Sequence, residues 1–263
     1  MTGPLLVFGR RPVLEALAAG RARAVLVAAG RAAGGRLGEI LEEAERGGVV
    51  VRPIPGERLG ELAEGAVHQG VAAEVAPGPA LSEGDLEATP WDEEAVVVVL
   101  DGVTDPRNVG AIARTAEAAG AAALVVRRRR GTGITGAAMK ASAGALLHLP
   151  LAEVHNIARA VGRLQRAGFW VLGLEAGAES TIEGAAPRGR LALVLGSEGE
   201  GLSRLVRESC DELVSIPLAG TVGSLNVSAA AAVALFSSLR VREGAHPPRG
   251  RVEDRKRGWG SPT

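Results

Sequence analysis

The alternation of short apolar runs with helical stretches after residue 95 is the feature that most constrains the fold. The run AVVVVL at 95–100 is continuous and rich in valine, which is typical of a strand buried on both faces of a parallel sheet. We expect further strands at 122–126, 146–149, 169–174, 191–195 and 213–216, with helices at 109–119, 137–143, 154–167, 202–207 and 226–239. This order predicts an α/β fold with a parallel sheet, in which ligands bind at the carboxyl ends of the strands.

A smaller α/β unit precedes this sheet. Its expected strands lie at 24–28, 49–52 and 71–75, with helices at 11–19 and 37–46. The residues that follow are rich in proline, glycine and acidic side chains and lack periodicity, which is typical of a linker. We therefore expect a first unit at 1–76, a linker at 77–94, a second unit at 95–240 and a basic, disordered tail at 241–263.

Charge and cysteine content exclude several classes of protein. The 30 basic and 30 acidic residues cancel, so any binding of nucleic acid must depend on local patches. Cys210 is the only cysteine and the four histidines are scattered, which gives no zinc-type ligand cluster. The chain has no run of 18 apolar residues and no cleavable leader, so we expect a cytoplasmic protein that does not span a membrane.

The stretch DGVTDPRNVGAIARTAEAAG, residues 101–120, directly follows the 95–100 strand. Asn108 would lie at a helix start, where capping alone could explain it, and Arg114 could be an ordinary solvated helix residue. Their position favours function, because Asn108, Gly110 and Arg114 cluster on the first two helical turns at the carboxyl end of the strand. Gly110 also leaves room for a close approach. The stretch is therefore a candidate ligand site.

The stretch LALVLGSEGEGL, residues 191–202, leads a buried strand into a glycine-rich turn. A flexible connection would explain the glycines, but Glu198 between Gly196 and Gly201 is well placed to hydrogen-bond a ligand.

The stretch VSIPLAGTVGSLNVSAAAAVALF, residues 214–236, passes from a strand through a loop of small residues into an alanine-rich helix. Ser224 and Asn226 could each be a helix cap. Beside the 191–202 turn, this loop could instead wrap a nucleoside with backbone donors and acceptors.

A fourth pattern, GTGITG at 131–136, matches the dinucleotide-binding fingerprint, and Glu153 lies roughly where a ribose-binding acid belongs. The run Arg127–Arg130 separates it from the preceding strand, whereas that fingerprint opens directly at a strand–helix turn. We therefore rank an oxidoreductase well below the alternatives. The arginine run fits a surface that faces phosphates, although a solvated basic turn would have the same composition.

Together and in this order, the first three stretches resemble the motifs of the SpoU (TrmH-type) family of RNA 2′-O-methyltransferases in the SPOUT superfamily. DPRNVGAIARTAEAAG is similar to its first motif, LVLGSEGEGL to its second, and IPLAGTVGSLNVSAAAAVALF to its third. The first unit, with FGRRPVLEAL and AVHQGVAAEV, resembles the L30e-like substrate-binding domain of one branch. Members of that RlmB-like branch methylate a guanosine ribose in 23S ribosomal RNA.

The resemblance implies a C-terminal deep trefoil knot, a homodimer, S-adenosylmethionine as the cofactor, RNA as the substrate and no metal. It implies cofactor contacts at Gly196, Ile216, Leu218 and Leu225. It implies chemical roles for Asn108, Arg114, Glu198, Ser224 and Asn226.

In this family the residue that matches Arg114 is assigned to activating the ribose hydroxyl, and the resemblance implies that it reaches the partner subunit's cofactor. A guanidinium keeps its proton at neutral pH, so it is a poor general base. We expect Arg114 to orient the ribose and stabilise the developing alkoxide, with the proton leaving through a phosphate or water. A transfer-RNA ribose methyltransferase and a non-catalytic RNA-binding protein on the same fold remain open alternatives.

Overall fold

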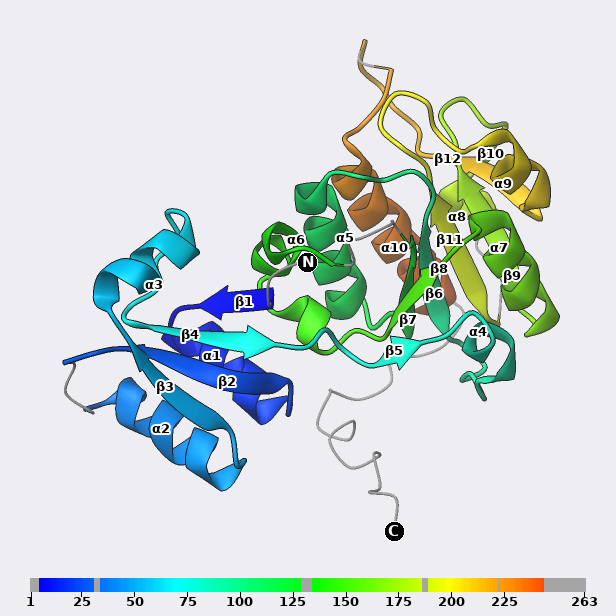
Figure 1. Cartoon of the computed structure of the whole chain (residues 1–263). Coiled ribbons are helices and arrows are strands. Elements are labelled where there is room, and N and C mark those ends of the chain that lie inside the picture. Colours follow the sequence, from blue (N-terminus) through cyan, green and yellow to red (C-terminus); the bar gives the residue numbers. More distant parts are fainter. Residues whose placement is uncertain (1–4, 31–33, 129–133, 186–188, 222, 244–263) are drawn as a thin grey trace.

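The computed structural model describes residues 5–30, 34–128, 134–185, 189–221 and 223–243. Within them the chain forms two α/β units that lie side by side (Figure 1). Parts of three predicted features lie outside the described residues: Arg129 and Arg130 of the arginine run, Gly131 and Gly133 of the dinucleotide-like pattern, and residues 244–263 of the 241–263 tail.

The first unit is built on a four-stranded sheet ordered β1-β4-β2-β3, in which β4 is antiparallel to β1 and β2, and β3 is parallel to β2. Successive residues of β4 enter different hydrophobic clusters, because side chains alternate across a strand: Val71 and Ala73 pack with α1 and α2, and Ala72 packs with α3. The expected strands and helices are confirmed to within two residues, and β1 and α3 are additional. The elements are β1 (Leu5–Phe8), α1 (Arg10–Ala18), β2 (Ala22–Ala28), α2 (Arg36–Arg46), β3 (Val50–Ile54), α3 (Gly56–Ala63) and β4 (Val71–Val75).

The second unit is built on an eight-stranded sheet ordered β10-β12-β9-β11-β6-β7-β8-β5, in which every neighbouring pair is parallel. Its first elements are β5 (Ala80–Leu81), α4 (Asp85–Ala88), β6 (Val96–Leu100), α5 (Pro106–Ala118), β7 (Ala123–Arg127), α6 (Gly136–Ala141), η1 (Ala145–Leu147) and β8 (Leu151–Val154). The remainder are α7 (Ile157–Arg166), β9 (Trp170–Leu174), β10 (Ser180–Thr181), α8 (Ile182–Ala185), β11 (Leu191–Leu195), α9 (Arg204–Ser209), β12 (Glu212–Ser215) and α10 (Val227–Glu243).

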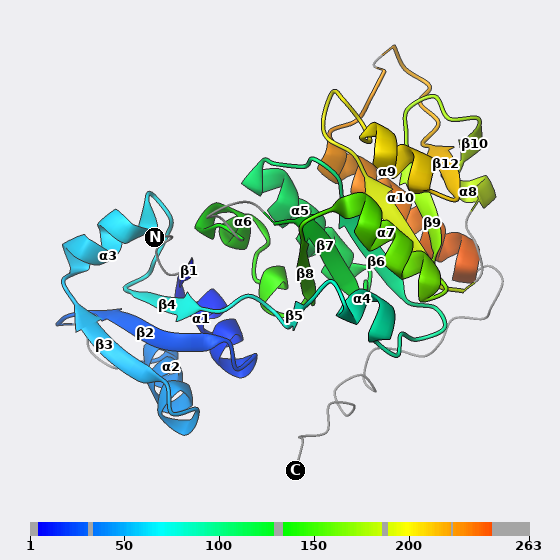
Figure 2. The ribbon, with the colours of Figure 1, turned by 45° about the vertical axis from the view of Figure 1, so that its right-hand side comes forward.

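Helices cover both faces of this sheet (Figure 2). Val96 and Val98 of β6 pack with α5 and α10, while Val97 and Val99 pack on the opposite side with α4, α7 and α9. Every residue of β6 and β11 is buried, which explains why both strands are continuous apolar runs. The prediction of a parallel α/β sheet is confirmed.

One predicted strand is wrong. Leu146 and Leu147 belong to the 3-10 helix η1, residues 148–149 form a turn, and the strand in this region is β8, which begins after Pro150. Leu146, Leu147 and Leu149 are all buried. His148 is exposed, and a run of four residues is too short for its pattern of burial to separate a strand from a helical turn.

Residues 77–94, expected to link the two units, also add structure to the second unit. Strand β5 pairs in parallel with β8 at the edge of the sheet. Leu86 and Trp91 are buried, and the Trp91 ring meets the Phe169 ring edge-on, with centroids 5.5 Å apart. These apolar residues are irregularly spaced in the sequence, so no periodic pattern marks them as part of a core.

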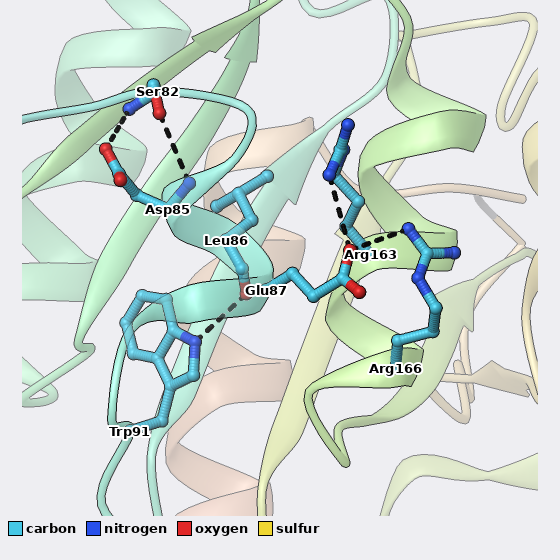
Figure 3. A network of polar contacts seen from close by, with 7 residues as sticks. All are labelled: Ser82, Asp85, Leu86, Glu87, Trp91, Arg163 and Arg166. Atoms are coloured by element: carbon cyan, nitrogen blue, oxygen red, sulfur yellow. Dashed lines mark hydrogen bonds and ion pairs between the residues drawn. The ribbon is translucent and has the colours of Figure 1, made fainter.

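Polar contacts tie the same segment to α7 (Figure 3). Glu87 accepts hydrogen bonds from Arg163 at 3.3 Å and from Arg166 at 2.9 Å, and the bond from Arg166 lowers the pKa of Glu87. The turn before α4 is closed reciprocally, because Ser82 N donates to Asp85 Oδ2 at 2.7 Å and Asp85 N donates to Ser82 Oγ at 3.2 Å. Helix α4 is therefore fixed against α7.

The two units are packed against each other through η1 and α6. Gly78 N donates to Leu146 O at 2.6 Å, and β1 lies against α6. Leu146 and Leu147 share one hydrophobic cluster with Val7 and Val13 of the first unit. No described helix is long and apolar enough to cross a membrane.

Candidate functional site

A cavity of about 710 Å³ lies at the carboxyl ends of β9, β11 and β12. The segments that follow these three strands line it, and this volume is typical of small-molecule sites in proteins. Its position matches the general rule for parallel α/β sheets, whose ligands bind at the carboxyl edge.

Six of the nine site residues predicted from the sequence line this cavity, and the other three, Asn108, Arg114 and Asn226, do not. Leu218 and Leu225 keep 41% and 38% of their surface exposed, so apolar side chains face the open space. The six are Gly196, Glu198, Ile216, Leu218, Ser224 and Leu225.

The turn after β11 requires glycine for steric reasons. A Cβ at position 196 would collide with the backbone of Gly201 and Leu202. The turn folds back at this point because Ser197 N donates to Gly201 O and Gly201 N donates to Ser197 O, both at 3.0 Å. Gly196 is therefore required by close packing, and a flexible connection does not explain it.

A chain of side-chain hydrogen bonds joins the three stretches. Asn226 Nδ2 donates to Asn108 Oδ1 at 3.2 Å and to Glu198 Oε2 at 3.4 Å. Asn226 Oδ1 also accepts from Ser228 N at 3.0 Å, so Asn226 caps α10 and holds the other two side chains at once. Asn226 is therefore a helix cap, as one of the two interpretations of the sequence predicted, but it also binds two other side chains.

The capping alternative is wrong for Asn108. The cap of α5 is Asp105, whose Oδ1 accepts from Arg107 N at 2.8 Å. Asn108 lies in the first turn of the helix, where its side-chain oxygen is free to meet Asn226.

Arg114 is not brought to the cavity by the chain that carries it. It is exposed, is absent from the cavity lining, and forms no ion pair with any residue that the structure describes. It lies two turns from Arg107, which is exposed on the same side of α5.

Asp101, the residue that directly follows β6, was not among the residues predicted from the sequence. Only 3% of its surface is exposed, and its Oδ2 accepts a hydrogen bond from Ser203 N at 2.7 Å. The available signal was a charged residue at the end of a fully apolar strand.

The dinucleotide-like pattern does not form a strand–helix turn. Helix α6 begins at Gly136, the last glycine of the pattern, whereas β7 already ends at Arg127. In the described part of the chain, no three His, Cys, Asp or Glu side chains converge as metal ligands.

The fold and the site define an α/β protein with a cavity of small-molecule size at the carboxyl edge of its parallel sheet and a second, smaller unit packed beside that sheet. Sequence comparison identifies the family to which it belongs. Residues 95–236 match the SpoU rRNA Methylase family, and residues 6–80 match the RNA 2′-O ribose methyltransferase substrate binding domain. The first match covers more than half of the chain, so the protein belongs to the SpoU rRNA methylase family.

Relatives and solved structures agree with this assignment. An uncharacterized tRNA/rRNA methyltransferase of Mycobacterium avium is 41% identical over 240 residues, which cover 90% of this chain and 78% of that protein. The 23S rRNA (guanosine-2′-O-)-methyltransferase RlmB of Escherichia coli is 46% identical over 150 residues, 57% of this chain and 62% of RlmB. A tRNA/rRNA methyltransferase of Synechocystis, also described as uncharacterized, is 50% identical, but the match spans only 38% of its length.

The crystal structure of the SpoU methyltransferase AviRb from Streptomyces viridochromogenes, in complex with the cofactor AdoMet, superposes with a TM-score of 0.78. The two chains are 28% identical, and the superposition covers 91% of each.

Proposed function

We propose that this protein transfers a methyl group from S-adenosylmethionine to the 2′-hydroxyl of a guanosine ribose in 23S ribosomal RNA. The observation that carries the proposal is the hydrogen-bonded group Asn108–Asn226–Glu198, which joins three distant stretches of the chain and reaches the cavity through Glu198. Two relatives support the proposal by name: RlmB is a 23S rRNA guanosine-2′-O-methyltransferase, and AviRb was crystallised in complex with AdoMet. An enzyme that acts on ribosomal RNA would work in the cytoplasm.

The cavity suits the proposed cofactor. Leu218 and Leu225 offer apolar surface for a flat base, and the backbone around Gly196 and Ile216 offers hydrogen bonds. Three carboxylates, those of Glu175, Glu198 and Glu200, line the cavity, and one guanidinium, that of Arg207, is paired with Glu175 at 2.9 Å. The resulting negative charge favours a cationic ligand. When bound, the cofactor supplies an electrophilic methyl group on a sulfonium.

The polar side chains then have distinct tasks. Asn226 holds Asn108 and Glu198 in fixed positions, and pre-organised groups of this kind place a reacting hydroxyl without a further loss of entropy. Ser224, exposed in the cavity wall, is placed to contact the ribose. Arg114 of the partner subunit orients the ribose and stabilises the negative charge that develops on its oxygen, and the proton leaves through a phosphate or water.

A homodimer is proposed because α10 presents an apolar face to solvent. Val233 and Phe236 are 40% and 43% exposed, and Ala229 is exposed one turn earlier on the same side. Helix α10 packs against α5, the helix that carries Arg114. A second copy that covers this face would bury the apolar side chains and bring its Arg114 towards the cavity.

Exposed cations beside α5 and α6 support RNA as the substrate. Arg107, Arg127, Arg128 and Lys140 are exposed and form no ion pair with a described residue. The first unit packs against α6, so an RNA strand that crosses these cations would reach both units. Contacts of this kind bind phosphates in any sequence.

A C-terminal trefoil knot is part of the proposal. The segments after β9, β11 and β12 enclose one cavity, and α10 then returns beneath β11 to pack on α5 and α8. A chain that passes through its own earlier loops would give a shorter contour length on mechanical unfolding than an unknotted chain of equal size.

The test of the activity uses labelled S-adenosylmethionine with unmodified 23S ribosomal RNA and, separately, transfer RNA, followed by mapping of the methylated ribose. Label on a 23S guanosine supports the proposal. Label on transfer RNA alone supports a transfer-RNA methyltransferase, and transfer RNA is one of the two RNA classes in the name of the Mycobacterium avium relative. Binding of RNA without any calorimetric affinity for the cofactor would identify a non-catalytic binding protein.

A further inference from the structure

Asp101 is a buried carboxylate at the carboxyl end of β6, with 3% of its surface exposed. Burying such a group is costly unless hydrogen bonds compensate it. Its Oδ2 accepts from Ser203 N at 2.7 Å, and Ser203 lies more than a hundred residues further along the chain. Position 101 therefore connects the first of the three stretches to the end of the second.

Ser203, the donor in this hydrogen bond, lies at the end of the turn that carries Glu198. The turn leaves β11 at Gly196, folds back through the paired bonds between Ser197 and Gly201, and reaches Ser203 just before α9. Glu198 lies at the tip of the turn, where it accepts from Asn226.

The entry to the turn is held by the same short segment. Asp101 N donates to Leu195 O at 2.8 Å. Gly102, with φ +75°, packs so closely under Ser197 that a Cβ there would lie 3.3 Å from the Ser197 Cβ. Asp101 and Gly102 thus hold both ends of the turn.

We infer that Asp101 is a positioning residue, whose carboxylate fixes the 196–203 turn and so aims Glu198 at Asn226. The inference rests on the proposed function for its catalytic consequence. It also makes a prediction about the turn itself, which does not depend on activity.

The first experiment removes either side of the hydrogen bond. Asp101→Ala removes the acceptor, whereas Asp101→Asn keeps a side-chain oxygen in place. Ser203→Pro removes the donor at a residue whose φ of −63° already suits proline, and Ser203→Ala keeps the N–H. Asp211→Ala is the control, because the Asp211 Oδ2 accepts from Val171 N at 2.8 Å at the opposite end of the sheet.

Measurement of kcat distinguishes a positioning role of Asp101 from a role in the overall stability of the protein. We expect Asp101→Ala and Ser203→Pro to lower kcat by roughly 5- to 150-fold, the range that corresponds to one unsatisfied buried hydrogen bond. Asp101→Asn, Ser203→Ala and Asp211→Ala should stay within about threefold of the parent chain, because each leaves the turn anchored. In a Glu198→Gln background, the Asp101→Ala effect should shrink to about twofold, because the two residues act as one unit. Equal effects of Asp101→Ala in both backgrounds would overturn the inference.

Hydrogen exchange provides a readout that needs no activity. Asp101→Ala and Ser203→Pro should speed exchange of the amides at 197–202, and Asp211→Ala should not. Unchanged exchange there refutes the anchoring role, even if the proposed methyl transfer is correct. Faster exchange in a protein that neither binds the cofactor nor methylates RNA would leave the anchor standing and refute the proposed function.

Discussion

Replacing Gly110 with alanine sets helix propensity against steric packing at the crossing of α5 and α6. Alanine is favoured over glycine inside a helix by about 1 kcal/mol. In this structure, a Cβ at position 110 would lie 2.5 Å from the Ala141 Cβ and 2.9 Å from Ser142 N, with Ala138 O closer still. Ordinary contact begins near 3.4 Å, so the helices would have to separate by about 1 Å.

We expect the steric cost of the new Cβ to exceed the gain in helix propensity. Two of the three atoms in the way are backbone atoms of α6 or of the residue that follows it, and they cannot rotate aside. Overpacking of this kind costs about 1–3 kcal/mol, and the rigidity of the site favours the upper end. After the propensity gain, we expect Gly110→Ala to lower the free energy of unfolding by about 2 kcal/mol.

The assay is urea unfolding followed by tryptophan fluorescence, because both described tryptophans, Trp91 and Trp170, lie in the second unit. Gly162→Ala is the matched control, since it lies inside α7 and its new Cβ would meet Arg166 Nη1 at 3.7 Å, an ordinary contact. The control should be stabilised by up to about 1 kcal/mol, so the two variants should shift the midpoint in opposite directions. A Gly110→Ala protein as stable as the parent would refute the steric reasoning.

Four further predictions concern the site, the dimer and the lone thiol. Arg114→Lys and Arg114→Ala should each lower turnover by about 100-fold or more, with cofactor affinity unchanged by calorimetry, and near-normal turnover in both would remove Arg114 from the mechanism. Gly196→Ala should abolish cofactor binding, because its Cβ displaces the turn that lines the cavity; retained affinity would contradict this. Phe236→Glu should convert a dimer into a monomer in light scattering, and an intact dimer would argue for another interface. Burial raises the pKa of Cys210 from 9.0 to about 12, so the unfolded thiol ionises first and stability should fall as pH rises from about 9 to about 12. Cys210→Ser should remove that part of the slope, and an identical slope in both proteins would show that Cys210 is not its source.

Much of the second unit could be predicted from local patterns. Strands β6 and β11 are continuous apolar runs because helices cover both faces of the sheet, and β11 matches its predicted bounds at both ends. The 146–149 run misled the prediction because four mostly apolar residues are too few to show whether the period is that of a strand or of a helical turn.

Part of the site could also be predicted, because its residues lie in the segments that follow predicted strands. Asn108, Glu198 and Asn226 each lie beyond a strand end, and parallel strands bring their carboxyl ends to one edge of the sheet. Asp101 could not be recognised in this way, because its partner is a backbone N–H that only the folded turn presents.

The amino-acid sequence alone determined the fold class, the family and the edge of the sheet at which the three stretches would meet, because hydrophobic period and motif order are local properties of the chain. Only the tertiary structure decided that Asp105 and not Asn108 caps α5, that Asn226 bonds both Asn108 and Glu198, and that Arg114 does not line the cavity of its own chain. Each of these depends on the distance and direction between atoms far apart in the sequence, and packing of the sheet and helices sets those quantities.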